Sequence, residues 1–254
     1  TIQNPNWLQP LVDRMKSDES IAALQPKILN YYNRKIFDYA GGSGGHLDLF
    51  CFPFARGRVF LEQEKDSGQY DDAQKCFWAS GTAMLVRKKT FFAAGKFDET
   101  FFAHMEEIDY HWKSQMLGYE IWVEPASVIY HKGALTLPVS STQKTYLNYR
   151  NSMILLLTNY PASTSFQLFF PRFFMECISL IKEILTFKWG HAFSIIKSWV
   201  WIMGHCGILK QRRKFLKDKN IAAPELIYQQ SIVKKYFIEG KKIHSSLGIL
   251  NRNN

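Results

Sequence analysis

Apolar residues recur every three or four positions in several segments of the chain, and this spacing predicts helices. The first such segment runs from Leu8 to Met15 and follows the Asn-Pro-Asn of residues 4–6, which is a typical helix start. The second covers residues 106–117, with an apolar stripe on one side and Gly118 as its stop. We expect both helices to pack their apolar face against a core.

Short apolar runs around these helices predict buried strands. Such runs occur at residues 21–24, 82–86, 121–123 and 127–130. We expect the first strand to end at Pro26, and we expect Gly81 to allow close approach of the backbone beside the second. The alternation of strands and helices is typical of an α/β domain.

Residues 41–45 contain four glycines and one serine. The run lacks the Gly-Lys-Ser/Thr that completes a phosphate-binding loop, and no periodic helix follows it. We therefore interpret it as a flexible loop. Residues 50–75 are polar and irregular, and residues 66–72 within them have the composition of a surface turn.

Charge is distributed unevenly along the chain. The sequence contains 32 Lys and Arg against 22 Asp and Glu. Residues 1–160 hold 17 of each kind, so the net charge of +10 belongs entirely to residues 161–254. This shift predicts a boundary near Tyr160, between a neutral α/β part and a basic tail. The four scattered cysteines argue against a disulfide scaffold and are typical of a reducing compartment.

The basic tail is also rich in large apolar residues. Residues 166–187 and 193–209 are apolar, but the first segment carries charges such as Arg172 and Glu176 and the second is short, so neither resembles a membrane span. Amphipathic helices that lie in the membrane interface fit better. A basic cluster follows, made of Lys210, Arg212, Arg213, Lys214, Lys217 and Lys219.

Such a cluster beside amphipathic helices suits an anionic membrane surface. The alternative is an ordinary helical appendage that packs on the first domain. Nucleic acid is not expected as a partner, because the aromatic residues are grouped with aliphatic ones and are not interleaved with the basic ones.

Three carboxylates crowd the start of the helix predicted over residues 106–117. Glu106, Glu107 and Asp109 lie within four residues, where the helix dipole stabilises acidic side chains. That structural role does not require three groups that repel one another. Partial burial of such a cluster raises the proton affinity of a carboxylate toward that of a general base. From these residues alone, a helix-terminal role and a catalytic role both stay open.

His131 ends the last predicted strand. A single histidine at such a position is more often structural than a ligand. Other catalytic signatures are absent from the sequence, among them His-Glu-x-x-His, Gly-x-Ser-x-Gly and the dinucleotide-binding fingerprint.

Six segments carry motifs in a fixed order, and these are residues 4–8, 78–87, 95–102, 105–110, 128–133 and 148–151. Together they resemble the family-2 glycosyltransferases, especially the rhamnosyltransferase-like branch of bacterial surface-polysaccharide synthesis. The resemblance implies an α/β fold of the GT-A type with a mixed, mostly parallel sheet, followed by a helical tail. Residues 1–160 would form the acceptor-side part of that domain, and residues 161–254 a basic amphipathic tail.

The resemblance also implies an inverting transfer, in which an acceptor hydroxyl attacks the anomeric carbon of a nucleotide-diphospho-sugar. The acceptor would be a glycan or a lipid-linked molecule. Glu107 matches the family's base, Glu106 a neighbour that shapes the site, and Asp109 an alternative base. The base would make the attacking hydroxyl nucleophilic.

Binding residues follow from the same resemblance. Trp78, Gly81 and Thr82 match a wall near the sugar and acceptor, and Arg150 is a candidate phosphate contact. His131 matches a metal ligand of some family members, where Mg²⁺ or Mn²⁺ stabilises the leaving diphosphate.

The Asp-x-Asp metal motif and the nucleobase-binding strands of the family normally precede the segment that matches residues 4–8. The sequence does not contain them. We therefore expect an N-terminally truncated domain that turns over little or nothing by itself.

The resulting hypothesis is a metal-dependent glycosyltransferase that lies peripherally on the cytoplasmic face of the inner membrane. The competing hypothesis is a non-catalytic module for membrane docking or scaffolding. The two differ at the acidic cluster, because an enzyme requires it to face inward, whereas a scaffold predicts a solvated helix end.

Overall fold

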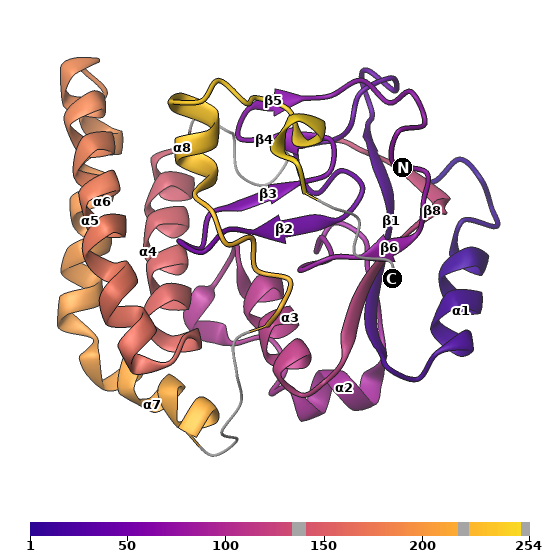
Figure 1. Cartoon of the computed structure of the whole chain (residues 1–254), viewed down its shortest axis with the longest axis horizontal. Coiled ribbons are helices and arrows are strands. Elements are labelled where there is room, and N and C mark those ends of the chain that lie inside the picture. Colours follow the sequence, from indigo (N-terminus) through magenta and orange to yellow (C-terminus); the bar gives the residue numbers. More distant parts are fainter. Residues whose placement is uncertain (134–140, 218–223, 250–254) are drawn as a thin grey trace. The chain divides into compact units, whose positions relative to one another are not determined.

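The computed structural model describes residues 1–133, 141–217 and 224–249 (Figure 1). The chain divides into two compact units. The first contains Thr1–Phe97, Tyr110–Gly133 and Pro224–Asn254, and the second contains Asp98–Asp109 and Ala134–Ala223. This division does not follow the boundary predicted near Tyr160.

A four-stranded mixed sheet forms the centre of the first unit, in the order β6-β8-β1-β7. The long strands β1 (Ile21–Asn30) and β8 (Glu120–His131) pair in parallel. The short strands β7 (Leu85–Val86) and β6 (Gln74–Lys75) pair antiparallel with β1 and β8 respectively. The structure is therefore mixed α/β, as the sequence predicts, but the expectation of a mostly parallel sheet is wrong, because among the described strands only β1 and β8 pair in parallel.

The observed strand bounds correct three predictions. β1 does not end at Pro26 but continues to Asn30, and the two runs predicted over 121–123 and 127–130 belong to one strand. The register shifts between Pro26 and Lys27. Proline cannot donate to the ladder and is tolerated at such an irregularity, so it interrupts the pairing without ending the strand. The run at 82–86 is shorter than predicted, because only Leu85 and Val86 are paired.

Three helices accompany the sheet, and they are α1 (Leu8–Ser17), α2 (Lys88–Ala93) and α3 (Glu106–Met116). Two of them, α1 and α3, are the ones predicted from the spacing of apolar residues. Leu11 of α1 is buried with Ile21 and Leu24 of β1. The glycine that follows α3, Gly118, has a φ of +85°, which suits a helix stop and confirms the predicted end.

A second, antiparallel sheet consists of four short strands, in the order β2-β3-β4-β5. The strands are β2 (Gly45–Leu47), β3 (Pro53–Ala55), β4 (Arg58–Val59) and β5 (Glu62–Gln63). The glycine run that leads into β2 is buried, which contradicts the predicted flexible loop. A Cβ atom at Gly42 would lie 2.2 Å from the carbonyl oxygen of Arg56, and one at Gly45 would lie 2.1 Å from the Trp78 ring. These positions require glycine because other chain segments pack directly against them.

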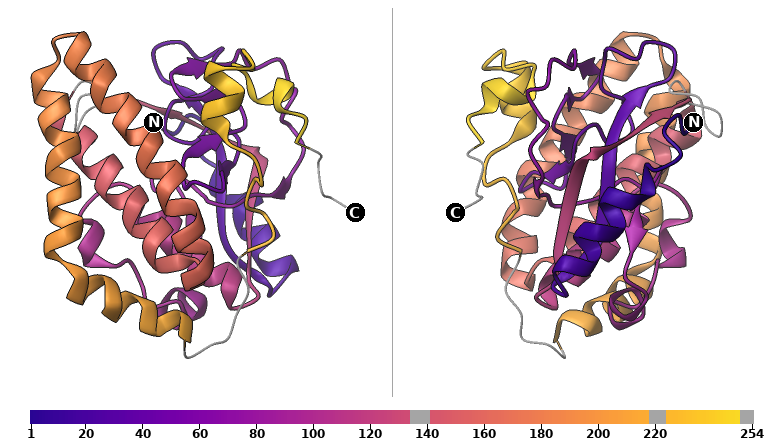
Figure 2. Two further views of the ribbon diagram at one scale, coloured as in Figure 1. Left: turned by 60° about the vertical axis from the view of Figure 1, so that its left-hand side comes forward. Right: turned by 90° about the vertical axis from the view of Figure 1, so that its right-hand side faces the viewer.

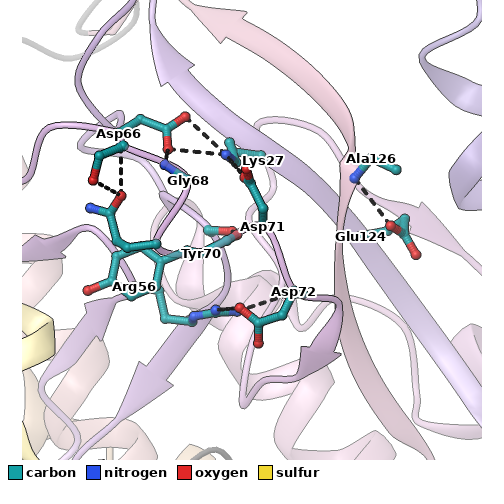
Figure 3. A network of polar contacts seen from close by, with 12 residues as sticks. Lys27, Arg56, Asp66, Gly68, Tyr70, Asp71, Asp72, Glu124 and Ala126 are labelled. Atoms are coloured by element: carbon teal, nitrogen blue, oxygen red, sulfur yellow. Dashed lines mark hydrogen bonds and ion pairs between the residues drawn. The ribbon is translucent and has the colours of Figure 1, made fainter.

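Two basic side chains of the first unit hold the predicted surface turn at residues 66–72 through ion pairs (Figure 3). Lys27 of β1 forms an ion pair with Asp66 at 3.0 Å and another with Asp71. Arg56 pairs with Asp72, and its guanidinium lies over the ring of Tyr70 at 4.8 Å. The turn therefore belongs to the packed body of the first unit.

Residues 224–249 pack on the β2–β5 sheet of the first unit. They contain α8 (Ile232–Phe237) and the short 3-10 helix η2 (His244–Leu247). The backbone N–H of Ile232 donates to Asp48 at 2.9 Å, and that of His244 donates to Glu64 at 2.8 Å. Two carboxylates thus anchor the end of the described chain.

The second unit is helical (Figure 2). Its elements are the 3-10 helix η1 (Glu99–Phe101), the first turn of α3, α4 (Thr142–Asn159), α5 (Ala162–Leu185), α6 (Trp189–Gly204) and α7 (Cys206–Lys217). Helix α4 is the most buried of these. Thr145 of α4 is hydrogen-bonded to His191 of α6 at 2.8 Å, and the tilted rings of Phe173 of α5 and Trp199 of α6 have their centres 4.8 Å apart.

Candidate active site

The carboxylates in the first turn of α3 are shielded from solvent to a large extent. Glu106 and Glu107 are half-buried, and one oxygen of each, Oε2, is fully covered. Within the described residues, no hydrogen-bond donor reaches either of these oxygens. Covered acceptors without partners are costly, so their persistence here points to a use other than stability.

This burial changes the acid–base properties of the pair. Loss of solvent raises the pKa of Glu107 to about 8, and the neighbouring charge of Glu106 adds to the increase. Burial also raises the pKa of Glu106. Two carboxylates that share a site lose their protons in two coupled steps, so the second proton is held into the neutral range.

Asp109 lies in the same first turn of α3 but occupies a different environment. Its side chain is fully buried, and Oδ1 accepts hydrogen bonds from Asn159 at 2.8 Å and from Arg212 at 2.7 Å. Arg212 of α7 also pairs with Asp98 and lies 4.6 Å from the centre of the Phe101 ring. The negative charge of Asp109 is therefore balanced, which makes it a structural anchor of the helix start.

The loop that leads into α3 has an unusual backbone. Phe102, His104 and Met105 all have φ values between +63° and +72°, a region that disfavours residues other than glycine. Strained conformations of this kind persist only where surrounding contacts enforce them, and they are enriched at functional sites.

Asn151 of α4 provides such contacts. Its Nδ2 lies 3.1 Å from the carbonyl oxygen of Phe101, 2.8 Å from that of Ala103 and 2.6 Å from that of His104. One buried amide thus contacts three carbonyl oxygens of the four-residue segment 101–104, just before Met105 and Glu106. This arrangement determines where the two glutamates are placed.

Arg150, the candidate phosphate contact, lies beside Asn151 and also donates hydrogen bonds to the loop before α3. Its guanidinium donates to the carbonyl oxygens of Thr100 at 2.9 Å and Phe101 at 2.8 Å, and to Asn151 Oδ1 at 2.9 Å. The residue is only 7% exposed. The structure therefore places Arg150 as a support of the same loop, and a contact with phosphate stays a prediction.

His104 is a site residue that the sequence analysis did not identify. It lies two positions before Glu106, and its Nε2 is covered without a partner among the described residues. Burial lowers its pKa, and the charge of Lys144 lowers it further. A neutral imidazole in this position can accept or donate a hydrogen bond.

His131 lies in the first unit at the end of β8. Its Nδ1 is 2.8 Å from Oδ1 of the buried Asp38. A carboxylate on one ring nitrogen fixes the orientation of the imidazole and leaves the other nitrogen available, which is the arrangement typical of histidine ligands. Asp38 was not singled out from the sequence, because it is distant from His131 in the chain.

The three predicted wall residues also lie in the first unit. Trp78 is buried, and its Nε1 donates to the carbonyl oxygen of His46 at 2.8 Å. Gly81 and Thr82 are exposed. A Cβ atom at Gly81 would meet no heavy atom within 4 Å, so the predicted close backbone approach is wrong there. Contact of these residues with a sugar stays a prediction.

A metal site requires several ligands close together. Within the described residues, no group of three or more His, Cys, Asp and Glu side chains could hold a metal ion. His131, oriented by Asp38, fits the role of a single ligand. The described residues therefore supply at most one part of a metal site.

Comparisons with known proteins were informative at the level of the fold. No protein-family model matches the chain. A segment of 60 residues is 37% identical to the N-acetylglucosaminyl-diphospho-decaprenol L-rhamnosyltransferase of Mycobacterium tuberculosis, in strain CDC 1551 / Oshkosh and in strain ATCC 25618 / H37Rv. This match covers 23% of the chain and 20% of that relative.

Among solved structures, the crystal structure of GalNAc-T7 with UDP, GalNAc and Mn²⁺ is similar, with a TM-score of 0.50 and 14% sequence identity. The likeness covers 92% of this chain and 38% of that one. At such low identity it shows the fold alone. The two likenesses support a family-2 glycosyltransferase-like fold of the GT-A type, as the resemblance in the sequence implies.

Proposed function

We propose that this chain is the acceptor-side part of an inverting glycosyltransferase, with Glu107 as its general base. The donor is a nucleotide-diphospho-sugar, and the acceptor is a hydroxyl of a glycan or a lipid-linked glycan. Support comes from the GT-A-like fold and from the partial likeness to a rhamnosyltransferase whose name describes a decaprenol-linked acceptor.

The observation that carries this proposal is the covered carboxyl group of Glu107. Its pKa of about 8, raised by burial and by Glu106, lies near the pH at which a general base works best. The strained loop before α3, fixed by Asn151, places this group reproducibly. A scaffold would not require a covered carboxylate in a fixed position.

The chemistry assigned to Glu107 is one proton transfer. The acceptor hydroxyl oxygen forms a bond to the anomeric carbon while the bond from that carbon to the diphosphate oxygen breaks. The hydroxyl proton passes to the Glu107 carboxylate, and the nucleotide diphosphate leaves with the bond's electron pair. Attack from the face opposite the leaving group inverts the anomeric configuration.

A divalent cation, Mg²⁺ or Mn²⁺, would stabilise the charge that develops on the leaving diphosphate. His131 is the described residue that fits as one of its ligands, with Asp38 holding the ring in place. Mn²⁺ binding by the full-length protein, followed by electron paramagnetic resonance, should weaken when either residue is replaced by alanine. Unchanged Mn²⁺ affinity in His131→Ala would remove His131 from this role.

A lipid-linked acceptor places the enzyme at a membrane. We propose that it lies peripherally on the cytoplasmic face of the inner membrane and takes part in cell-surface polysaccharide synthesis. The basic, apolar character of residues 161–254 supports this location.

Replacement of the base in the full-length protein tests the proposed reaction. Glu107→Gln should slow sugar transfer by about 10²–10⁴-fold, because it removes the proton acceptor and preserves the shape of the side chain. Binding of the nucleotide-sugar should be retained. Glu99→Gln, an exposed acid of η1 in the same unit, is the matched control. Transfer at the wild-type rate by Glu107→Gln would refute the assignment.

A further inference from the structure

The outward side of α5 carries an uninterrupted apolar stripe. Its members recur every three or four residues and are 53–72% exposed, and they are Phe166, Phe170, Phe174, Ile178, Ile181 and Leu185. Such spacing places them on one face of the helix. The neighbouring helix α6 also exposes large apolar side chains, those of Phe193, Ile196, Val200 and Met203. We refer to these two sets together as the outer face.

The charged residues of α5 lie on the opposite side. Arg172 and Glu176 are each 1% exposed and form an ion pair at 2.9 Å. Arg172 also donates to Ser152 of α4 at 2.6 Å, and Trp199 of α6 donates to Glu176 at 2.5 Å. The buried side of α5 therefore holds a charged pair beside its aromatic contact with α6, while its outward side is apolar, unlike the helices of a water-facing bundle.

This inverted distribution matches the physics of a lipid environment. Ionisable residues of membrane-embedded helices face the interior of the bundle and pair there, while apolar residues face the acyl chains. In the sequence, Arg172 and Glu176 argued against a membrane segment. Because they are buried and paired, they are compatible with a helix in contact with lipid. An exposed apolar surface of this extent on a protein marks an interaction site.

The exposed charges beside the outer face are of one sign. Lys182, Lys188 and Lys197 are exposed, whereas the side chain of Glu183 is only 14% exposed and pairs with Lys182. Lysine side chains at the edge of an apolar helix face can reach anionic headgroups while their stems stay with the acyl chains. A second protein copy would bring the same positive charges together and so repel.

The lengths of the helices favour a position within the interface. No single described helix meets the length and hydropathy requirements of a membrane span, although α6 together with residues 206–214 does so as a pair bent by 67°. Helix α5 has 24 residues and exposes Lys182 in its last turn. A helix of this kind lies along the membrane plane, with its apolar face below the headgroups.

We propose that the outer face of α5 and α6 is the surface that enters an anionic lipid bilayer, with Lys182, Lys188 and Lys197 at the level of the phosphates. This inference deepens the membrane location in the proposed function, and it does not depend on the transfer chemistry. It also assigns membrane contact to α5 and α6 in preference to α7. In α7, Arg212 and Arg213 of the basic cluster point inward, to Asp109 and to the carbonyl oxygen of Tyr160, and Lys219 lies outside the described residues.

Vesicle co-sedimentation of the full chain tests this assignment. The vesicles contain phosphatidylcholine with phosphatidylglycerol, or phosphatidylcholine alone. The variant Phe170→Ser/Phe174→Ser/Ile181→Ser should weaken binding to both kinds at least about tenfold, because it removes large apolar side chains from the acyl-chain region. These residues are exposed, so the fold is retained, which circular dichroism checks. The matched control, Leu61→Ser/Phe92→Ser/Ile238→Ser, changes equally exposed residues elsewhere and should bind as wild type.

A second variant, Lys182→Gln/Lys188→Gln/Lys197→Gln, tests the contribution of the positive charges. It should weaken binding to the anionic vesicles only, and added salt should have the same effect on the wild type. The control Lys16→Gln/Lys88→Gln/Lys89→Gln alters exposed lysines of the first unit and should leave binding unchanged.

Two results would overturn the inference. The first is wild-type vesicle binding by the outer-face serine variant. The second is a wild-type chain that does not bind vesicles but is a dimer in light-scattering measurements, while the serine variant is a monomer. That result would make the outer face an interface between two copies of the chain. Sugar transfer to a water-soluble acceptor is measured separately with the full-length enzyme. If that transfer occurs while vesicle binding fails, only the membrane inference is overturned and the proposed reaction stands.

Discussion

Arg212 of α7 donates a 2.7 Å hydrogen bond to Asp109 in the first turn of α3, and both side chains are buried. A basic residue of the tail, expected near lipid headgroups, thus balances a carboxylate that was an alternative candidate for the base. Asp109 consequently anchors the helix start, which leaves Glu106 and Glu107 as the covered acids of the cluster without a charge partner among the described residues.

Loss of this ion pair should strongly destabilise the second unit. Arg212→Ala leaves Asp109 buried without its main charge partner, which typically lowers the free energy of unfolding by about 3–5 kcal/mol. Urea unfolding measures the change. Lys210→Ala, an exposed position on the same helix, should shift stability by no more than about 0.5 kcal/mol. Equal effects of the two variants would contradict the role given to Arg212.

Asn151 should affect catalysis through the loop before α3. Asn151→Ala leaves three carbonyl oxygens without their shared donor, at a cost of about 1–3 kcal/mol in unfolding free energy. In the full-length enzyme, kcat should fall more than the KM for the donor rises, because Glu107 is displaced from its working position. Asn148→Ala, a half-buried residue of the same helix, is the control. A change in stability without any change in kcat would limit Asn151 to a structural role.

Acid should destabilise the first unit through its buried histidines, among them His46 and His244. Burial lowers the pKa of His46 to about 3 and that of His244 well below its usual value, and their rings stack at 5.0 Å. Because the unfolded chain binds protons below about pH 6.5 and the folded chain does not, stability is complete above that pH. It declines below it by about 1.4 kcal/mol per pH unit for each histidine.

His46→Phe should reduce this dependence. Phenylalanine can keep the stacking on Phe54 and His244 and has no proton to bind. Unfolding free energies between about pH 5 and pH 7.5 would fall less steeply in the variant than in the wild type. Parallel pH profiles of the two proteins would show that His46 does not contribute.

Features with a local cause were predictable from the sequence. Helix α3 was placed correctly because an apolar stripe and a stop glycine define its length. The acidic cluster at the start of α3 was found because three carboxylates lie within four residues, but the sequence left open whether they are solvated or buried. The α/β class followed from the alternation of elements.

Features that depend on tertiary contacts were not predictable in this way. Local sequence could not show that Pro26 lies within a strand, since pairing with β8 carries β1 past it. The buried state of Gly42 and Gly45 depends on Arg56 and Trp78, which are distant in sequence. The inward direction of Arg172 depends on Ser152 of another helix.

The pH dependence of kcat/KM tests the central claim, that a covered Glu107 is the base, most directly. In the full-length wild type, transfer should increase with pH up to about 8, because only ionised Glu107 accepts the proton. In Glu106→Gln, this limb should move to lower pH, because the repelling charge that helps to raise the pKa of Glu107 is removed. An identical acid limb in both proteins, well below pH 8, would contradict the account.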